Sequence, residues 1–103
     1  MITKTRRMNE LLDWYEDLLT AKQKEVMHFY YQQDLSLREI AQELGVSHNA
    51  VFDTVERATK RLEMIETSVQ AVSYYNNIQA LIKQLKEKEI KEIETIVSKM
   101  EQL

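Results

Sequence analysis

Residues 36–51 read SLREIAQELGVSHNAV. Ser36 and Glu39 have the three-residue spacing of a capping box, which satisfies the free N–H groups at the start of a helix. Gly45 comes directly after the apolar face of that helix, where a helix end favours a left-handed backbone conformation. Ser47 is a good N-cap for a second helix. We therefore predict a helix-turn-helix over about residues 36–62.

The apolar side chains of this segment predict how its two helices pack. Ala41 has to be small, because the second helix crosses close to the first at this residue, and Gly45 supplies the turn. The residues predicted to hold the helices at a fixed angle are Ile40, Ala41, Leu44, Gly45, Val46, Val51 and Val55.

The rest of the chain also predicts helices. Its 103 residues include one glycine and no proline, whereas the tight turns of β-sheets usually need such residues. One amphipathic helix is predicted over about residues 5–19, and another begins at Thr20, which can form a capping box with Gln23. Their predicted buried residues are Met8, Leu11, Leu12, Tyr15, Leu18 and Leu19, then Val26, Met27, Phe29 and Tyr30. We predict an all-α helical bundle that contains the helix-turn-helix and ends in a long helical C-terminal tail.

The predicted organisation is an N-terminal helical domain of residues 1–63 and a helical tail of residues 64–103. The apolar stripe of the tail shifts its phase at the polar run Lys86–Glu89, which fits either one long helix or two. Because a domain of about 60 residues has a limited core, we expect the tail to pair with a second copy as a homodimer. The alternative is a monomer whose tail folds back on its own domain.

Composition excludes several classes of function. The chain has 14 basic and 17 acidic residues, so we do not expect non-specific binding to DNA or anionic lipid that rests on electrostatic attraction alone. Zero cysteines exclude a disulfide, a thiol nucleophile and a thiolate zinc site, and His28 and His48 lack neighbours at metal-ligand spacing. No phosphate loop or catalytic triad is present, so we predict no enzyme activity, cofactor or small-molecule substrate. No apolar run approaches about 18 residues, so we predict no membrane span and a cytoplasmic protein.

The second helix of a helix-turn-helix projects into the major groove of DNA. The predicted nucleic-acid-binding residues are Arg38, Ser47, His48, Asn49, Phe52, Arg57, Lys60 and Arg61. Arginine pairs with guanine and asparagine with adenine. From Val46 to Ile65, however, three basic residues are balanced by three acidic ones, among them Asp53 and Glu56 on the predicted outward face. DNA binding and protein docking therefore both stay open for this element.

Part of the chain resembles region 4 of bacterial sigma factors. The resemblance covers about residues 19–62 and rests on LTAKQ at 19–23, Tyr30-Tyr31, residues 36–51, Arg57-Ala58 and Leu62. The whole chain is similar to the YlxM-like family of small bacterial proteins, through its Arg7-Met8-Asn9 opening, its Leu18-Leu19-Thr20 and its helical tail. Genes of that family lie beside those for the signal recognition particle protein and its receptor. The resemblance thus implies a cytoplasmic protein with a regulatory part in protein targeting.

Two functions of different classes follow. The first is a DNA-binding regulatory protein that acts as a dimer. The second is an adaptor that binds a protein or RNA component of the signal recognition particle through its helical surfaces.

Overall fold

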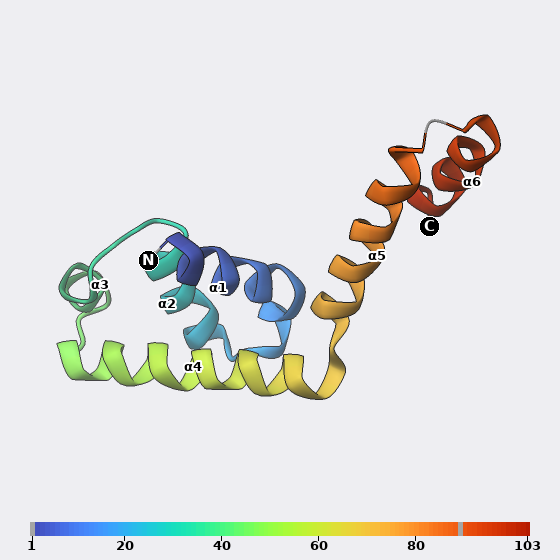
Figure 1. Ribbon diagram of the computed structural model, residues 1–103. Helices are drawn as coiled ribbons and strands as arrows, with labels where there is room; N and C mark the ends of the chain where they lie inside the picture. Colours follow the sequence, from blue (N-terminus) through green and yellow to red (C-terminus); the bar gives the residue numbers. More distant parts are fainter. Residues whose placement is uncertain (1, 89) are drawn as a thin grey trace. The chain divides into compact units, whose positions relative to one another are not determined.

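The computed structural model describes the backbone of residues 2–88 and 90–103, and side chains from residue 5 onward within those ranges. These residues form α-helices and one 3₁₀ helix and contain no strand, so the predicted all-α fold is confirmed (Figure 1). The elements are α1 (Ile2–Tyr15), η1 (Glu16–Leu18), α2 (Ala21–Tyr31), α3 (Leu37–Leu44), α4 (His48–Val69), α5 (Ala71–Lys86) and α6 (Lys91–Glu101).

The helices divide into two compact units. The N-terminal unit is Met1–Gln70 and the C-terminal unit is Ala71–Leu103. Helix α4 continues past residue 63, at which we placed the end of the first domain, and ends at Val69. Gln70 then closes it in a left-handed conformation with φ 56°.

Helix α4 is the central helix of the N-terminal unit. Helices α1, α2 and α3 all pack against it, and Figure 1 shows α1 and α2 lying along it. The apolar faces of the four helices supply the core because each presents a stripe at helical spacing. Its fully buried residues include Leu11, Leu12, Val26, Met27, Ile40, Val51 and Leu62.

The predicted core is wrong at Leu18, whose surface is 57% exposed. The first α-helix ends at Tyr15 instead of Leu19, and the chain continues as the 3₁₀ helix η1. The tighter 3₁₀ turn changes the periodicity, so the stripe set by Leu11 and Tyr15 no longer includes Leu18. Phe29 and Tyr30 of α2 are half-buried and do not belong to the fully buried core either.

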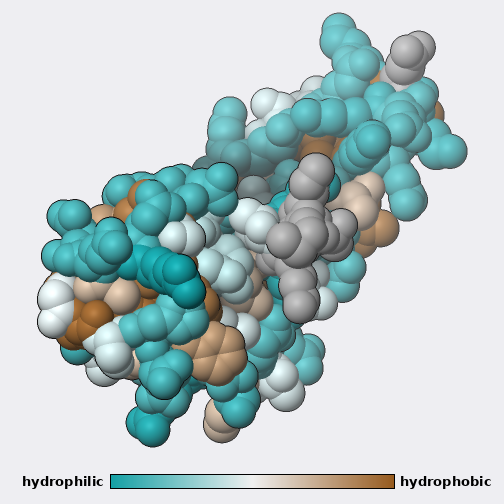
Figure 2. Space-filling model, turned by 90° about the vertical axis from the view of Figure 1, so that its left-hand side faces the viewer, coloured by the Kyte–Doolittle hydropathy of each residue, from teal (hydrophilic) through white to brown (hydrophobic). Residues whose placement is uncertain are grey.

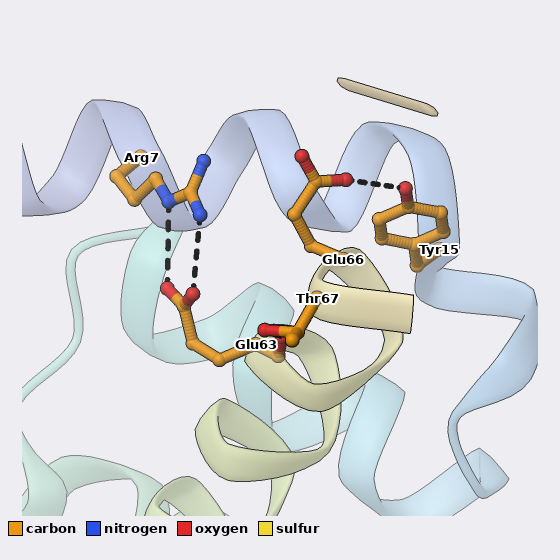
Figure 3. Close-up of polar contacts among 5 residues, drawn as sticks. All are labelled: Arg7, Tyr15, Glu63, Glu66 and Thr67. Carbon is orange, nitrogen blue, oxygen red and sulfur yellow. Dashed lines mark hydrogen bonds and ion pairs between the residues drawn. The ribbon is translucent and has the colours of Figure 1, made fainter. Parts of the chain in front are cut away.

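Two polar contacts fasten the second half of α4 to α1 (Figure 3). The Arg7 guanidinium lies 3.1 Å from a carboxylate oxygen of Glu63. The Tyr15 hydroxyl donates to the carboxylate of Glu66 at 2.6 Å, and Glu66 is buried with 6% of its surface exposed. Loss of one partner of a buried hydrogen bond leaves the other polar group unsatisfied, so this contact ties α4 to α1. These contacts fix α4 at the end opposite to its N-terminal turns.

The C-terminal unit is a pair of helices in contact, α5 and α6. The phase slip at the polar run is therefore a break between two helices, although Glu89 of that run lies outside the described residues. Ile82 of α5 and Val97 of α6 are buried, and Lys86 pairs with Glu101 at 2.9 Å. Tyr74, Leu81 and Ile96 are each more than half exposed.

Candidate nucleic-acid interface

Helix α3 starts at the predicted capping box. The Ser36 hydroxyl accepts from the Glu39 N–H at 3.1 Å, and the Glu39 carboxylate accepts from the Ser36 N–H at 3.0 Å. The backbone hydrogen bond from Ser36, followed by its hydroxyl, lowers the pKa of Glu39. The box satisfies two N–H groups that an uncapped helix would leave open.

Helix α3 ends at the turn that the single glycine makes possible. Gly45 has φ 66° and ψ 35°, and the Val46 N–H returns to the Ala41 carbonyl at 3.0 Å. This bond joins residues five positions apart and is the longer of the two backbone hydrogen bonds that define a Schellman motif. A Cβ atom added at Gly45 would meet nothing within 4 Å, so the position needs glycine for its backbone conformation and not for space.

Helix α4 starts at His48, three residues after Gly45. The Ser47 hydroxyl accepts from the Ala50 N–H at 3.1 Å, as an N-cap does. Of the residues predicted to hold the two helices together, Ile40, Ala41, Val51 and Val55 are buried, Leu44 and Val46 are half-buried, and Gly45 is exposed at the turn.

The predicted nucleic-acid-binding residues all lie on the surface. Arg38 is exposed near the start of α3, and Ser47 is exposed at the turn. The others are exposed on α4: His48, Asn49, Phe52, Arg57, Lys60 and Arg61. At about 100° per residue, Asn49, Arg57 and Lys60 point away from the buried Val51, Val55 and Ala58, whereas His48, Phe52 and Arg61 lie on the flanks of that buried stripe. The predicted residues therefore spread over the solvent-facing side of α4, and Phe52 and Arg61, nine residues apart, point in nearly opposite directions.

Acidic side chains interrupt this side. Asp53 and Arg57, one turn apart, form an ion pair at 3.0 Å with side chains 58% and 74% exposed. Such an exposed pair contributes little to stability, about 0.3–0.5 kcal/mol within a helix. Figure 2, seen from the side where α3 and the start of α4 lie in Figure 1, shows mostly hydrophilic residues with smaller hydrophobic patches between them.

One hollow adjoins this side. It has a volume of about 320 Å³ and is lined by aromatic and aliphatic residues, Tyr30, Tyr31, Leu37, Phe52 and Val55, together with the polar Glu56, Thr59 and Lys60. The rings of Tyr30 and Tyr31 meet edge to face with centroids 4.8 Å apart. Burial raises the pKa of Tyr31. The sequence predicted Tyr30 as a buried residue but did not place Phe52 beside it, because α2 and α4 are adjacent only in the folded chain.

Two further observations bear on other kinds of site. Within residues 5–88 and 90–103, no three His, Asp or Glu side chains gather at a spacing that could hold a metal ion. Over the same described part of the chain, no helix combines the length and apolarity that crossing a bilayer requires. His28 is half-buried and contacts Glu16 instead.

Residues 2–102 match the family described as UPF0122, "Putative helix-turn-helix protein, YlxM / p13 like". The chain belongs to this YlxM-like family. It is 42% identical over 103 residues to a UPF0122 protein of Bacillus thuringiensis (strain Al Hakam), which covers all of this chain and 93% of that protein. UPF0122 proteins of Bacillus cereus (strain AH187) and Bacillus anthracis (strain A0248) match it with the same identity and coverage.

Proposed function

We propose that this YlxM-like chain is a cytoplasmic, non-enzymatic regulatory protein that binds duplex DNA with the first turns of α4. The observation that carries the proposal is the exposed side of the helix-turn-helix. A Schellman turn at Gly45 and an N-cap at Ser47 set the start of α4, and Asn49 and Arg57 point outward from it. Asparagine and arginine are the residues best suited to read adenine and guanine in the major groove.

The remaining cations have a supporting role in this proposal. Lys60 and Arg61 continue along α4, and Arg38 lies near the start of α3, so they are placed to contact phosphates on either side of the groove. The Ser47 hydroxyl already accepts from Ala50, which leaves its hydrogen to donate to a phosphate oxygen, and His48 can donate from its ring.

The acidic residues of α4 should lower its affinity for DNA of arbitrary sequence. Asp53 holds Arg57 by an ion pair, and Glu56 lies one turn from Lys60. These carboxylates repel phosphates, so binding to arbitrary DNA should be weak and base contacts should contribute a large share of the affinity.

The test is duplex binding measured by fluorescence anisotropy over several salt concentrations. Arg57→Ala should weaken binding and relax the base preference at one position, and Lys60→Ala should reduce the salt slope by about one phosphate contact. Lys83→Ala, an exposed cation in the C-terminal unit, serves as the matched control and should leave the slope unchanged. Asp53→Asn combined with Glu56→Gln should strengthen non-specific binding. A full chain that shows no salt-dependent duplex binding in any of these forms would end the proposal.

We further propose that the protein acts as a homodimer through the C-terminal unit. The C-terminal unit, Ala71–Leu103, has two helices. It buries Ile82 and Val97, but the surfaces of Leu81 and Ile96 are 52% and 55% exposed. A unit of this size rarely supplies a sufficient core alone. A second copy would cover the apolar side chains and present a second α4, as a two-part DNA site requires.

Light scattering of the full chain tests the dimer. Leu81→Glu with Ile96→Glu should convert a dimer mass to a monomer mass, because two charges would enter the interface. Thr95→Glu, also exposed on α6, is the control for added charge. A monomer mass in the unmodified protein, unchanged after deletion of residues 90–103, would overturn the dimer.

The second candidate function is an adaptor for the signal recognition particle, which the YlxM-like resemblance implies. The observation that favours it is the hollow lined by Tyr30, Tyr31 and Phe52, beside a helix face whose charges balance. Isothermal titration with the particle's protein, with its RNA and with duplex DNA separates the two functions. The adaptor predicts binding to the protein or the structured RNA with little duplex affinity.

A further inference from the structure

Phe52 is an apolar residue on a side of α4 that otherwise carries polar and charged groups. It is 49% exposed and lies one turn after Asn49, between the residues proposed to read bases. A single exposed apolar side chain is common on protein surfaces. Phe52 differs because it belongs to a patch: its ring borders the hollow lined by Tyr30, Tyr31, Leu37 and Val55.

Phe52 lies at the edge of this hollow. The residues that line it with Phe52 lie on α2, α3 and α4 and include the polar Glu56, Thr59 and Lys60, while about half of Phe52 faces solvent. An aromatic side chain has only two side-chain torsions, so it loses little conformational entropy when a ligand covers it. Phe52 is therefore an accessible apolar contact on the proposed DNA-reading surface.

The major groove offers one apolar group to such a contact. Its other base-edge groups are hydrogen-bond donors or acceptors, whereas thymine presents its C5 methyl group. We propose that Phe52 packs on the methyl group of a thymine and thereby selects an A·T base pair at that position. This inference rests on the proposed DNA binding and adds to it the class of sequence that is read.

Asn49 extends the same preference to a neighbouring base pair. Asn49 and Phe52 are three residues apart on one helix face, which corresponds to about 4.5 Å along the helix axis. Base pairs are spaced about 3.4 Å apart, so the two side chains reach the same or adjacent pairs. Asparagine forms its two-bond contact with adenine. Together they predict a site in which A·T pairs lie under the first two turns of α4.

Thymine-to-uracil exchange tests this contact because it removes the methyl group alone. Duplexes that the full chain enriches from a random library are resynthesised with deoxyuridine in place of thymine, one position at a time. The unmodified protein should bind about fourfold more weakly at one thymine position, the factor expected for burial of one methyl group. Phe52→Ala should bind the thymine and uracil duplexes equally, and Phe52→Leu should retain part of the preference.

Tyr74→Ala, which removes an exposed ring from the C-terminal unit, is the matched control and should leave the thymine preference intact. Three results would overturn the inference while leaving DNA binding in place. They are duplex binding without an enriched sequence, enriched duplexes in which no uracil exchange weakens binding, and a thymine preference that survives in Phe52→Ala. The absence of any duplex binding would remove this inference together with the proposed function.

Discussion

The two units of the chain are both built from helices, with α-helices of 8 to 22 residues in the N-terminal unit and of 16 and 11 residues in the C-terminal unit. They differ in how those helices start and what they bury. In the N-terminal unit, α2, α3 and α4 each begin at a side-chain cap, provided by Thr20, Ser36 and Ser47. In the C-terminal unit, α6 begins at Ile90, which makes no side-chain cap hydrogen bond. The N-terminal unit buries apolar residues from all four of its α-helices, whereas the buried apolar residues of the described C-terminal unit are Val72, Ile82 and Val97.

This difference shows that amphipathic helices alone do not define a self-sufficient unit. Local signals and a shared core specify the N-terminal unit, so its structure should respond to changes in the core and in the turns. The C-terminal unit has the hydrophobic pattern without enough helices to cover it, which agrees with the proposed role as a dimer interface. Substitutions at matched positions in the two units test this contrast.

The largest effect is expected from overpacking the helix crossing. Ala41 is 7% exposed where α3 packs against α4, and its carbonyl receives the Val46 N–H. Ala41→Leu adds three carbon atoms to this site and should lower the free energy of unfolding by about 1–3 kcal/mol. Urea unfolding followed by the fluorescence of Trp14, the chain's single tryptophan, measures the change.

The matched change in the other unit is Ala80→Leu, because Ala80 is exposed on α5. It should alter stability by no more than about 0.5 kcal/mol. Equal costs for the two substitutions would mean that the alanine at the helix crossing is not selected by packing.

The next effect concerns two of the three left-handed residues in the described part of the chain, the one inside the helix-turn-helix and the one at the end of α4. Gly45 has φ 66° and Gln70 has φ 56°. For residues other than glycine this conformation costs roughly 1–2 kcal/mol. Glycine loses more conformational entropy on folding than other residues do, and this lowers the stability of a protein with glycine by about 0.5–1 kcal/mol. Gly45→Ala should therefore destabilise by about 1 kcal/mol, and Gln70→Gly should stabilise by about 0.5 kcal/mol.

Chemical denaturation with a constant m-value checks both signs. Gly45→Asn provides the control, because asparagine tolerates the left-handed region better than alanine does. A Gly45→Ala protein as stable as the original would remove the conformational reason for glycine in the turn.

Much of the N-terminal unit could be predicted from sequence because its signals are local. The capping boxes at Thr20 and Ser36, the turn at Gly45 and the cap at Ser47 each occupy a few consecutive residues. The residues on the exposed side of α4 followed from helical periodicity once Ser47 was placed as its start.

The features that sequence reasoning missed depend on contacts between distant residues. Tyr15 and Glu66 are 51 residues apart, and a glutamate is ordinarily placed on a solvated face. The signal that could have located Glu66 is its position four residues after Leu62, within the apolar stripe of α4. Leu18 was misplaced because the change from α-helix to 3₁₀ helix after Tyr15 has no strong sequence marker. The hollow beside Phe52 also depends on distant residues, because it forms only where α2 packs against α4.

The smallest effect concerns the pH dependence of stability, in which the two capping boxes of the N-terminal unit should differ. The box of α2 uses Gln23, which does not titrate, whereas the box of α3 uses Glu39, whose pKa is lowered by the Ser36 N–H and then by its hydroxyl. A carboxyl with a lowered pKa in the folded state stabilises the fold above its unfolded pKa, and this contribution is lost as the pH falls through the folded value. Stability should therefore decline below the ordinary glutamate pKa of 4.5.

Glu39→Gln converts the α3 box into a copy of the α2 box. Its stability should change less than that of the original protein between neutral and acidic pH, whereas Gln23→Glu should add a second acid-sensitive cap. The lowered pKa of Asp17, caused by its hydrogen bond and charge interaction with Lys24, is present in all three proteins and cancels in the comparison. Urea midpoints read by Trp14 fluorescence at several pH values measure the effect. Parallel pH profiles for the original protein and Glu39→Gln would show that the carboxylate of this box does not contribute to the stability of the N-terminal unit.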